Sequence, residues 1–194
     1  MRRNLIISIL YTIVTAVLLG VLYPLLMTGL AQALFRDKAN GQLIIRNGQI
    51  IGAKIIGQAF SGSDYFHGRP SSAGTNGYDA SSSSGSNYGP TNMKYIDQVA
   101  SDVASLQAEN RGTPVPIDLV TRSASGLDPD ITPAAALFQV PRIAKARGFS
   151  GDSLKKLIAK HIQPRQLGFL GEPRVNVLEL NLDLDNMPEQ VTPK

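Results

Sequence analysis

The chain has 194 residues, enough for one membrane segment and one compact domain of about 160 residues. It contains no cysteine, which excludes disulfides, zinc thiolates and thiol catalysis together. The net charge is +4, and Arg2 and Arg3 supply two of the 19 basic residues, so the rest of the chain is nearly neutral. Because nucleic-acid readers carry a basic stripe and this sequence has none, we expect no nucleic-acid partner.

The first 35 residues predict a transmembrane helix. From Asn4 to Phe35 there is no charged residue and no histidine, and a helix needs roughly 20 apolar residues to cross the hydrocarbon layer. The alternative is a signal peptide, because Ala31-Gln32-Ala33 resembles a cleavage site. Signal peptides have apolar regions of only about 7–15 residues, so we favour a retained anchor.

The charges that flank the anchor predict its orientation. Arg2, Arg3 and the terminal amine lie on one side, whereas Arg36-Asp37-Lys38 carries a net charge of only one on the other. By the positive-inside rule, residues 1–35 form a cytoplasmic N-terminus and a single membrane span, and the rest of the chain is extracytoplasmic.

One face of the anchor carries small residues at four-residue spacing: Thr12, Ala16 and Gly20. Small residues let a second helix approach closely in lipid, so we predict that this face contacts a partner helix. The alternative is that such residues are simply common in membrane helices. Pro24 is expected to kink the helix just beyond this face.

The domain that follows has α+β character. After a polar linker at 36–42, Leu43–Arg46 and Gln49–Ile56 predict a β-hairpin, because Asn47-Gly48 suits the positive φ values of a type I′ turn. We place a single mixed α/β soluble domain at 43–187 and a flexible tail at 188–194.

Residues 57–91 are rich in Gly, Ser, Asn and Pro, a composition typical of a flexible or disordered loop. The aromatic residues within it favour a partly ordered, functional loop. We predict that the 57–92 segment is a partner surface, since exposed aromatics and Arg carry binding energy at interfaces. Its predicted contact residues are Tyr65, Phe66, Arg69, Asn87 and Asn92, and Arg69 is expected to point outward. The alternative is that Tyr65 and Phe66 only cover the hairpin.

The rest of the domain reads mainly as helix. Thr91 is predicted to cap a helix over 92–110, and Pro114 and Pro116 to force Ile117–Val120 into an extended form. A helix starting at Thr132-Pro133 should break near Pro141 and stop at Gly148; another, capped by Ser150, should end before Pro164. Val175–Leu184 fits either a bulged strand or a short helix, and we favour the helix.

Little in the sequence indicates catalysis. The two histidines, His67 and His161, are too few for a metal site without cysteine, and no phosphate-binding loop is present. We therefore assign no catalytic or metal-binding residue and no cofactor of its own. Asp128 lies in Asp128-Pro129-Asp130, which we interpret first as a turn. A membrane-anchored extracytoplasmic serine hydrolase that uses His67 stays the alternative.

Several segments together resemble one family, the C subunit of the bacterial Kdp potassium-transporting ATPase. They are Tyr65–Ser71, Gly85–Asn92, Asp118–Thr121, Ser125–Pro129, Pro141–Arg147 and Leu170–Asn176. The departures are Tyr88, Arg122 and Asp130, where the family pattern has Leu, a small residue and His.

The resemblance implies a non-catalytic accessory subunit of a high-affinity potassium uptake complex in the bacterial inner membrane. Its implied partners are an ATP-hydrolysing P-type subunit and a potassium-channel-like subunit. The family's implied role is to stabilise the assembly and to act as a catalytic chaperone that raises the ATP affinity of the ATP-hydrolysing subunit. ATP would then bind only through the complex. Asp128 is added to the expected contact residues on the same ground.

Overall fold

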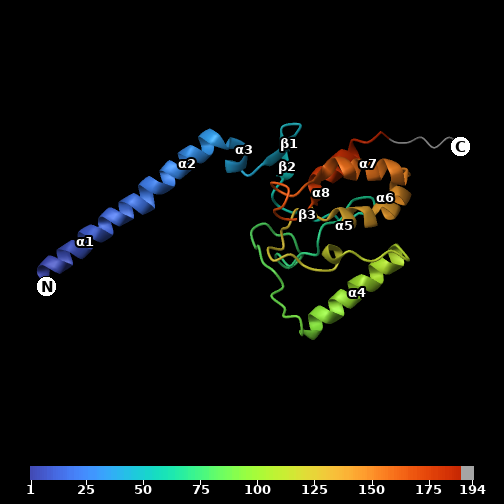
Figure 1. The fold of residues 1–194 in the computed structure, drawn as a ribbon, viewed down its shortest axis with the longest axis horizontal. Coiled ribbons are helices and arrows are strands. Elements are labelled where there is room, and N and C mark those ends of the chain that lie inside the picture. Colours follow the sequence, from blue (N-terminus) through green and yellow to red (C-terminus); the bar gives the residue numbers. More distant parts are fainter. Residues whose placement is uncertain (189–194) are drawn as a thin grey trace. The chain divides into compact units, whose positions relative to one another are not determined.

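The computed structural model describes residues 1–188 and divides the chain into two compact units, Met1–Ile51 and Gly52 onward (Figure 1). An apolar N-terminal helix precedes a domain that mixes helices with a small sheet, as the predicted α+β class requires. The boundaries predicted at 36–42 and 43–187 stay predictions. The tail predicted at 188–194 lies, apart from Pro188, outside the described residues.

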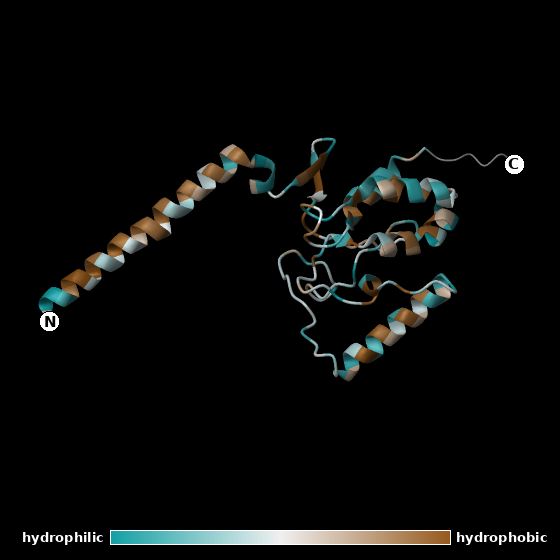
Figure 2. Cartoon of the chain, viewed as in Figure 1, coloured by the Kyte–Doolittle hydropathy of each residue, from teal (hydrophilic) through white to brown (hydrophobic). Residues whose placement is uncertain are grey.

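The N-terminal helix runs from Arg2 to Leu34 and is long and apolar enough to cross a membrane. It consists of α1 (Arg2–Val17), a π-helical turn η1 (Leu18–Leu22) and α2 (Tyr23–Leu34). Figure 2 shows apolar residues around it along most of its length. The wide turn has a local cause: Pro24 lacks an N–H and its ring crowds the carbonyl one turn earlier, and Tyr23 N instead bonds to Leu18 O.

A short helix, α3 (Arg36–Ala39), occupies most of the segment predicted as a linker, and a hairpin of β1 (Leu43–Arg46) and β2 (Gln49–Ala53) follows it. The φ angles of Asn47 and Gly48 are +52° and +77°, as the predicted type I′ turn requires. The hairpin is confirmed, although its second strand ends at Ala53 rather than at Ile56.

Most of the core comes from the C-terminal half of the chain. The strands β3 (Asp130–Ile131), β5 (Arg174–Asn176) and β4 (Ile162–Gln163) form an antiparallel sheet in that order, with Val175 opposite both Ile131 and Ile162. The helices α5 (Pro133–Phe138), α6 (Val140–Arg147), α7 (Gly151–His161) and α8 (Val177–Asp185) gather beside it (Figure 1). The most deeply buried apolar side chains include Phe66, Ile143, Leu154, Ile158, Val175, Leu180 and Leu184.

Local signals placed three of these helices correctly. Thr132 and Ser150 cap α5 and α7 through their hydroxyls, and Gly148 ends α6 at φ +70°. The chain breaks between α5 and α6 just before Pro141, as predicted.

The segment at Val175–Leu184 contains both predicted alternatives. It begins in β5 and turns into α8 at Val177, where the Asn176 side chain accepts a hydrogen bond from Glu179 N. The change in apolar spacing at this point marks the switch from strand to helix.

Two local predictions were wrong. Asn92, not Thr91, caps α4 (Met93–Glu109), because its carboxamide oxygen lies 2.9 Å from Lys94 N. Residues Ile117–Leu119 form a 3₁₀ turn, η2, instead of an extended segment. That turn buries Leu119 in the core and brings the Asp118 carboxylate to Thr132 N at 2.6 Å.

Candidate functional site

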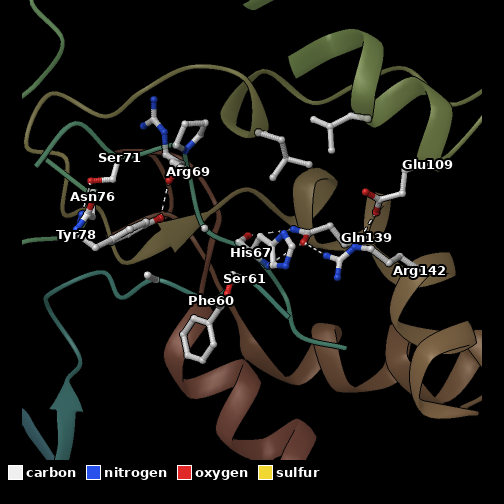
Figure 3. A pocket seen from close by; sticks show the side chains of 16 residues that line it. Phe60, Ser61, His67, Arg69, Ser71, Asn76, Tyr78, Glu109, Gln139 and Arg142 are labelled. Carbon is white, nitrogen blue, oxygen red and sulfur yellow. Dashed lines mark hydrogen bonds and ion pairs between the residues drawn. The ribbon is translucent and has the colours of Figure 1, made fainter. Parts of the chain in front are cut away.

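The loop 57–92 contains no helix or strand, yet much of it is held against the domain by side chains from distant elements. Composition alone predicted disorder, and the expectation of a partly ordered loop is confirmed. Its central stretch, residues 60–78, crosses one face of the domain and lines the hollow drawn in Figure 3.

Two buried carboxamides hold the loop by its backbone. Asn181 of α8 accepts a hydrogen bond from Phe66 N and donates one to Phe66 O, both at 2.9 Å. Gln139, between α5 and α6, does the same for the next residue, with 2.8 Å to His67 N and 3.1 Å to His67 O. Each carboxamide pairs with both the N–H and the C=O of one loop residue, as a neighbouring strand would. The backbone groups of Phe66 and His67 are therefore paired where the loop enters the core.

Two arginines bind the carbonyls that precede this point. Arg142 of α6 donates to Ser63 O at 2.5 Å and to Tyr65 O at 2.9 Å. Its remaining donors reach Gln139 Oε1 at 2.6 Å and Glu109 Oε1 at 2.7 Å. Because a guanidinium has five donors in a fixed plane, Arg142 joins α4, α6 and the loop in one rigid network.

Arg147 fixes Tyr65. Its guanidinium lies 4.5 Å from the centre of the Tyr65 ring, donates to Asp64 O at 2.7 Å and pairs with Asp185 at 2.8 Å. The Tyr65 hydroxyl donates to the same carboxylate at 3.2 Å. Tyr65 is therefore half-buried between α6 and α8 rather than free on the surface.

Arg69 turns toward the protein, contrary to the expectation that it points outward. Its guanidinium pairs with Asp128 at 3.1 Å and donates to the carbonyls of Thr121 and Arg122 at about 3.3 Å. The extended backbone expected before Pro70 stays a prediction, and these three acceptors lie inward. Asp128 also accepts from Asp130 N at 3.1 Å, which confirms the turn predicted there.

A second group of bonds folds the serine- and glycine-rich part of the loop. Ser71 Oγ donates to Gly126 O at 2.5 Å and accepts from Tyr78 N at 2.8 Å. The Tyr78 hydroxyl donates to Arg69 O, and burial followed by the charge of Asp128 raises the pKa of Tyr78 to about 12. Tyr78 therefore serves as a neutral hydrogen-bond donor at any physiological pH.

The hollow beneath these groups measures about 480 Å³ and mixes polar with apolar walls. His67, Arg142 and Glu109 lie on one side, with Tyr78 and Asn76 on the other (Figure 3). Burial lowers the pKa of His67; the carbonyl of Gly62, 2.8 Å from its Nε2, opposes that shift. The ring is thus predominantly neutral at pH 7 and is held in place by a backbone acceptor.

Among the residues that the structure describes, neither histidine is hydrogen-bonded to a serine. A serine nucleophile needs a histidine base within hydrogen-bond reach. His67 Nε2 instead faces Gly62 O, and the Ser71 hydroxyl donates to Gly126 O. His161 pairs with Asp183 at 3.0 Å on the far end of α7. Within residues 1–188, no three His, Asp or Glu side chains group as a metal site.

The nine predicted contact residues fall in three places. Thr12, Ala16 and Gly20 lie along the exposed N-terminal helix, and a side chain added at Gly20 would meet no atom of the chain within 4 Å. Tyr65, Phe66, Arg69 and Asp128 belong to the network just described, and Asn87 and Asn92 lie near the start of α4.

The structure gives these residues different surroundings. Phe66 is fully buried, so its side chain has the core role that was the alternative prediction, although it packs in the main core and not on the hairpin. Asn87 is exposed and has a φ of +53°. The Asn92 carboxamide accepts the hydrogen bond that caps α4. The partner contacts themselves stay a prediction.

Sequence reasoning missed the four residues that order the loop: Gln139, Asn181, Arg142 and Arg147. One signal was available for Asn181, a polar residue among Leu178, Leu180, Leu182 and Leu184 on a largely apolar helix. A buried amide at such a place must be bonded, but the sequence does not say to what.

The structure defines a chain with one long apolar N-terminal helix, followed by an α+β domain whose long loop is held by polar side chains of distant elements. The sequence matches the family described as "KdpC: K+-transporting ATPase, c chain" over residues 5–186. It is 61% identical to the potassium-transporting ATPase KdpC subunit of Koribacter versatilis over the full length of both chains. The corresponding subunit of Acidobacterium capsulatum is 62% identical over 93% of this chain and 96% of its own. That of Methylobacterium nodulans is 50% identical over 96% of each.

The chain belongs to the KdpC family. It is an accessory subunit of the P-type potassium-transporting ATPase complex and not its catalytic subunit. The resemblance noted in the sequence is therefore confirmed.

Proposed function

We propose that the chain binds the ATP-hydrolysing P-type subunit and the potassium-channel-like subunit of its complex, stabilises that assembly, and raises the ATP affinity of the ATP-hydrolysing subunit. The observation that carries the proposal is the full-length likeness to relatives named as KdpC subunits of a potassium-transporting ATPase. The domain's internal polar network supports a binding role, since interfaces work best when their residues are held in place before the partner arrives.

In this proposal the N-terminus is cytoplasmic and the domain lies outside the bacterial inner membrane. The support is the charge difference between Arg2 and Arg3 on one side and Arg36-Asp37-Lys38 on the other. The exposed, apolar N-terminal helix is suited to lie among the membrane helices of the partners.

The effect on ATP affinity is then indirect, because ATP is scarce outside the cell. Two arginines of α6 support this, since Arg142 and Arg147 already donate to carbonyl and carboxylate oxygens of the chain itself. A phosphate group would have to displace those acceptors. The second candidate, direct contact with ATP, requires the opposite orientation.

Two measurements test the proposal. Complexes are purified from detergent-solubilised membranes with and without the chain, and ATP hydrolysis is measured against ATP concentration. We expect both large subunits to co-purify with the tagged chain, and KM for ATP to rise when the chain is absent. An unchanged KM in an intact complex would remove the chaperone role, and failure to recover either subunit would remove the assembly role.

The orientation is tested by labelling. A cysteine-free chain is convenient here, because Ser82→Cys introduces the only thiol. In intact spheroplasts this thiol should react with a membrane-impermeant maleimide, whereas the thiol of Asn4→Cys should react only after lysis. The reverse pattern would place the domain in the cytoplasm and support direct ATP contact.

A further inference from the structure

The turn between β4 and β5 exposes three large apolar side chains close together. In the 165–172 turn, Leu167 is 83% exposed, Phe169 69% and Leu170 47%. Three such side chains within four residues form a patch of the kind that marks interaction sites.

The 165–172 turn is rigid although it projects. Gln166 and Leu170 exchange two backbone hydrogen bonds, each 2.9 Å long, across the turn. At the base of the turn, Arg165 Nη2 donates to both carboxylate oxygens of Glu172, at 2.9 and 2.7 Å. The apolar side chains are therefore displayed in one arrangement, which lowers the entropy that binding would cost.

The backbone at Leu167 argues that leucine is there for its side chain. Leu167 and Gly168 have φ angles of +52° and +84°, and Phe169 N bonds to Gln166 O, so residues 166–169 form a type I′ turn. In the turn between β1 and β2, Asn47 has the same φ of +52°. Asparagine tolerates this conformation and leucine resists it, so a turn needed only as a connection would carry Asn or Gly. Leucine at position 167 is unfavourable both for the backbone conformation and for solvation, which indicates that its side chain has a function in binding.

We propose that the 165–172 turn inserts Leu167 and Phe169 into an apolar pocket on a large subunit of the same transporter. This inference rests on the proposed function, since it names the part of the chain that meets that partner. The shape and the charge of the turn indicate which kind of partner it binds. The turn is a narrow projection that fits a pocket, and its only charges, Arg165 and Glu172, neutralise each other. It thus lacks the basic residues by which surface elements bind anionic lipid headgroups.

Substitution in the full complex tests the inference. Leu167→Asn and Phe169→Ser should each lower recovery of the large subunits roughly tenfold, the scale expected when one apolar anchor is lost. Leu167→Asn should at the same time keep or raise the melting temperature of the purified chain, because it relieves the backbone. The matched control, Leu137→Gln, removes a leucine of 44% exposure from α5 and should leave recovery unchanged.

The outcomes separate this inference from the proposed function. If the unsubstituted chain recovers no large subunit, the proposed function fails. If it does and Leu167→Asn recovers as much, only the turn's role is overturned. A fall in melting temperature parallel to the loss of recovery would also overturn it, since the turn would then be structural.

Photo-cross-linking identifies what covers the turn. A benzoylphenylalanine placed at Phe169 should cross-link to one large subunit in the intact complex, whereas the same residue at Leu137 should not. Cross-links to lipid, to a second copy of this chain, or to nothing would each overturn the proposal.

Discussion

The carboxamide of Asn181 forms two hydrogen bonds of 2.9 Å to the backbone of Phe66, a residue 115 positions earlier in the chain. Both residues are at most 1% exposed. This pair fixes the point where the loop 57–92 enters the core.

Asn181→Ala should therefore lower the free energy of unfolding by about 4 kcal/mol, because it leaves two buried backbone groups of Phe66 unpaired. Chemical unfolding of the detergent-solubilised chain measures this. Gln107→Ala, on an exposed position of α4, serves as the control and should change the stability by less than about 0.5 kcal/mol. Equal effects of the two substitutions would show that the loop is not held by this amide.

Gly126→Ala should be among the more damaging glycine substitutions. Gly126 has φ +68°, and an added Cβ would lie 2.5 Å from Ser84 O and 2.7 Å from Ala73 N, both backbone atoms. We expect a loss of about 2–3 kcal/mol from strain and displacement of the loop. Gly89→Ala meets no atom within 4 Å and should change the stability by less than about 1 kcal/mol. Thermal melts of the two variants, measured side by side, test this difference in stability.

Arg69→Ala tests whether this residue acts inside the domain or at a partner. We expect a loss of about 2 kcal/mol, mainly because the carbonyls of Thr121 and Arg122 lose their donor. The ion pair with Asp128 itself should contribute only about 0.5–1 kcal/mol in a double-mutant cycle, since both side chains are roughly 30% exposed. Lost potassium uptake with an unchanged melting point would instead support the partner contact predicted from the sequence.

His67 should make the domain sensitive to mild acid. Burial lowers its pKa in the folded state below the ordinary value of 6.5, so the unfolded chain binds the proton more readily. The associated stability is present above pH 6.5 and is lost as the pH falls below it. His67→Gln should flatten the slope of unfolding free energy against pH in the range below 6.5. Parallel profiles for the two chains would contradict this.

Gly20→Leu tests the small face of the N-terminal helix. In an α-helix, residues four apart are offset by about 40° around the axis, and the wider π turn reduces that offset, so Gly20 stands more nearly above Ala16. The chain itself has room for the new side chain, and leucine favours lipid. Recovery of the large subunits should fall without loss of membrane insertion, while Val21→Leu should recover normally. Full recovery with Gly20→Leu would exclude this face as a contact.

Local signals made most of the secondary structure predictable. The caps at Thr132 and Ser150, the stop at Gly148 and the Asn47-Gly48 turn all act over a few residues, and each was placed correctly. The misreading of Ile117–Val120 shows the limit, because the burial of Leu119 and the bond from Thr132 N to Asp118 depend on the finished core.

The site was less predictable for the same physical reason. Arg69 and Phe66 were recognised as important, but the acceptors of Arg69 lie more than 50 residues away, and so does the amide that holds Phe66. Propensity and periodicity describe neighbours in sequence, whereas a loop without repeating hydrogen bonds is ordered by whichever distant side chains complete them.

The long separation between Phe66 and Asn181 also bears on how the protein is made. The ribosome supplies the loop first and α8 later, because Asn181 follows Phe66 by 115 residues. Until α8 is synthesised, the backbone of Phe66 lacks its Asn181 partner and the core around Phe66 lacks Leu180 and Leu184. Contacts this distant in sequence form late and slowly. The loop therefore reaches its final structure only after α8 has been synthesised, and a nascent chain truncated before Asn181 would present this segment to proteases.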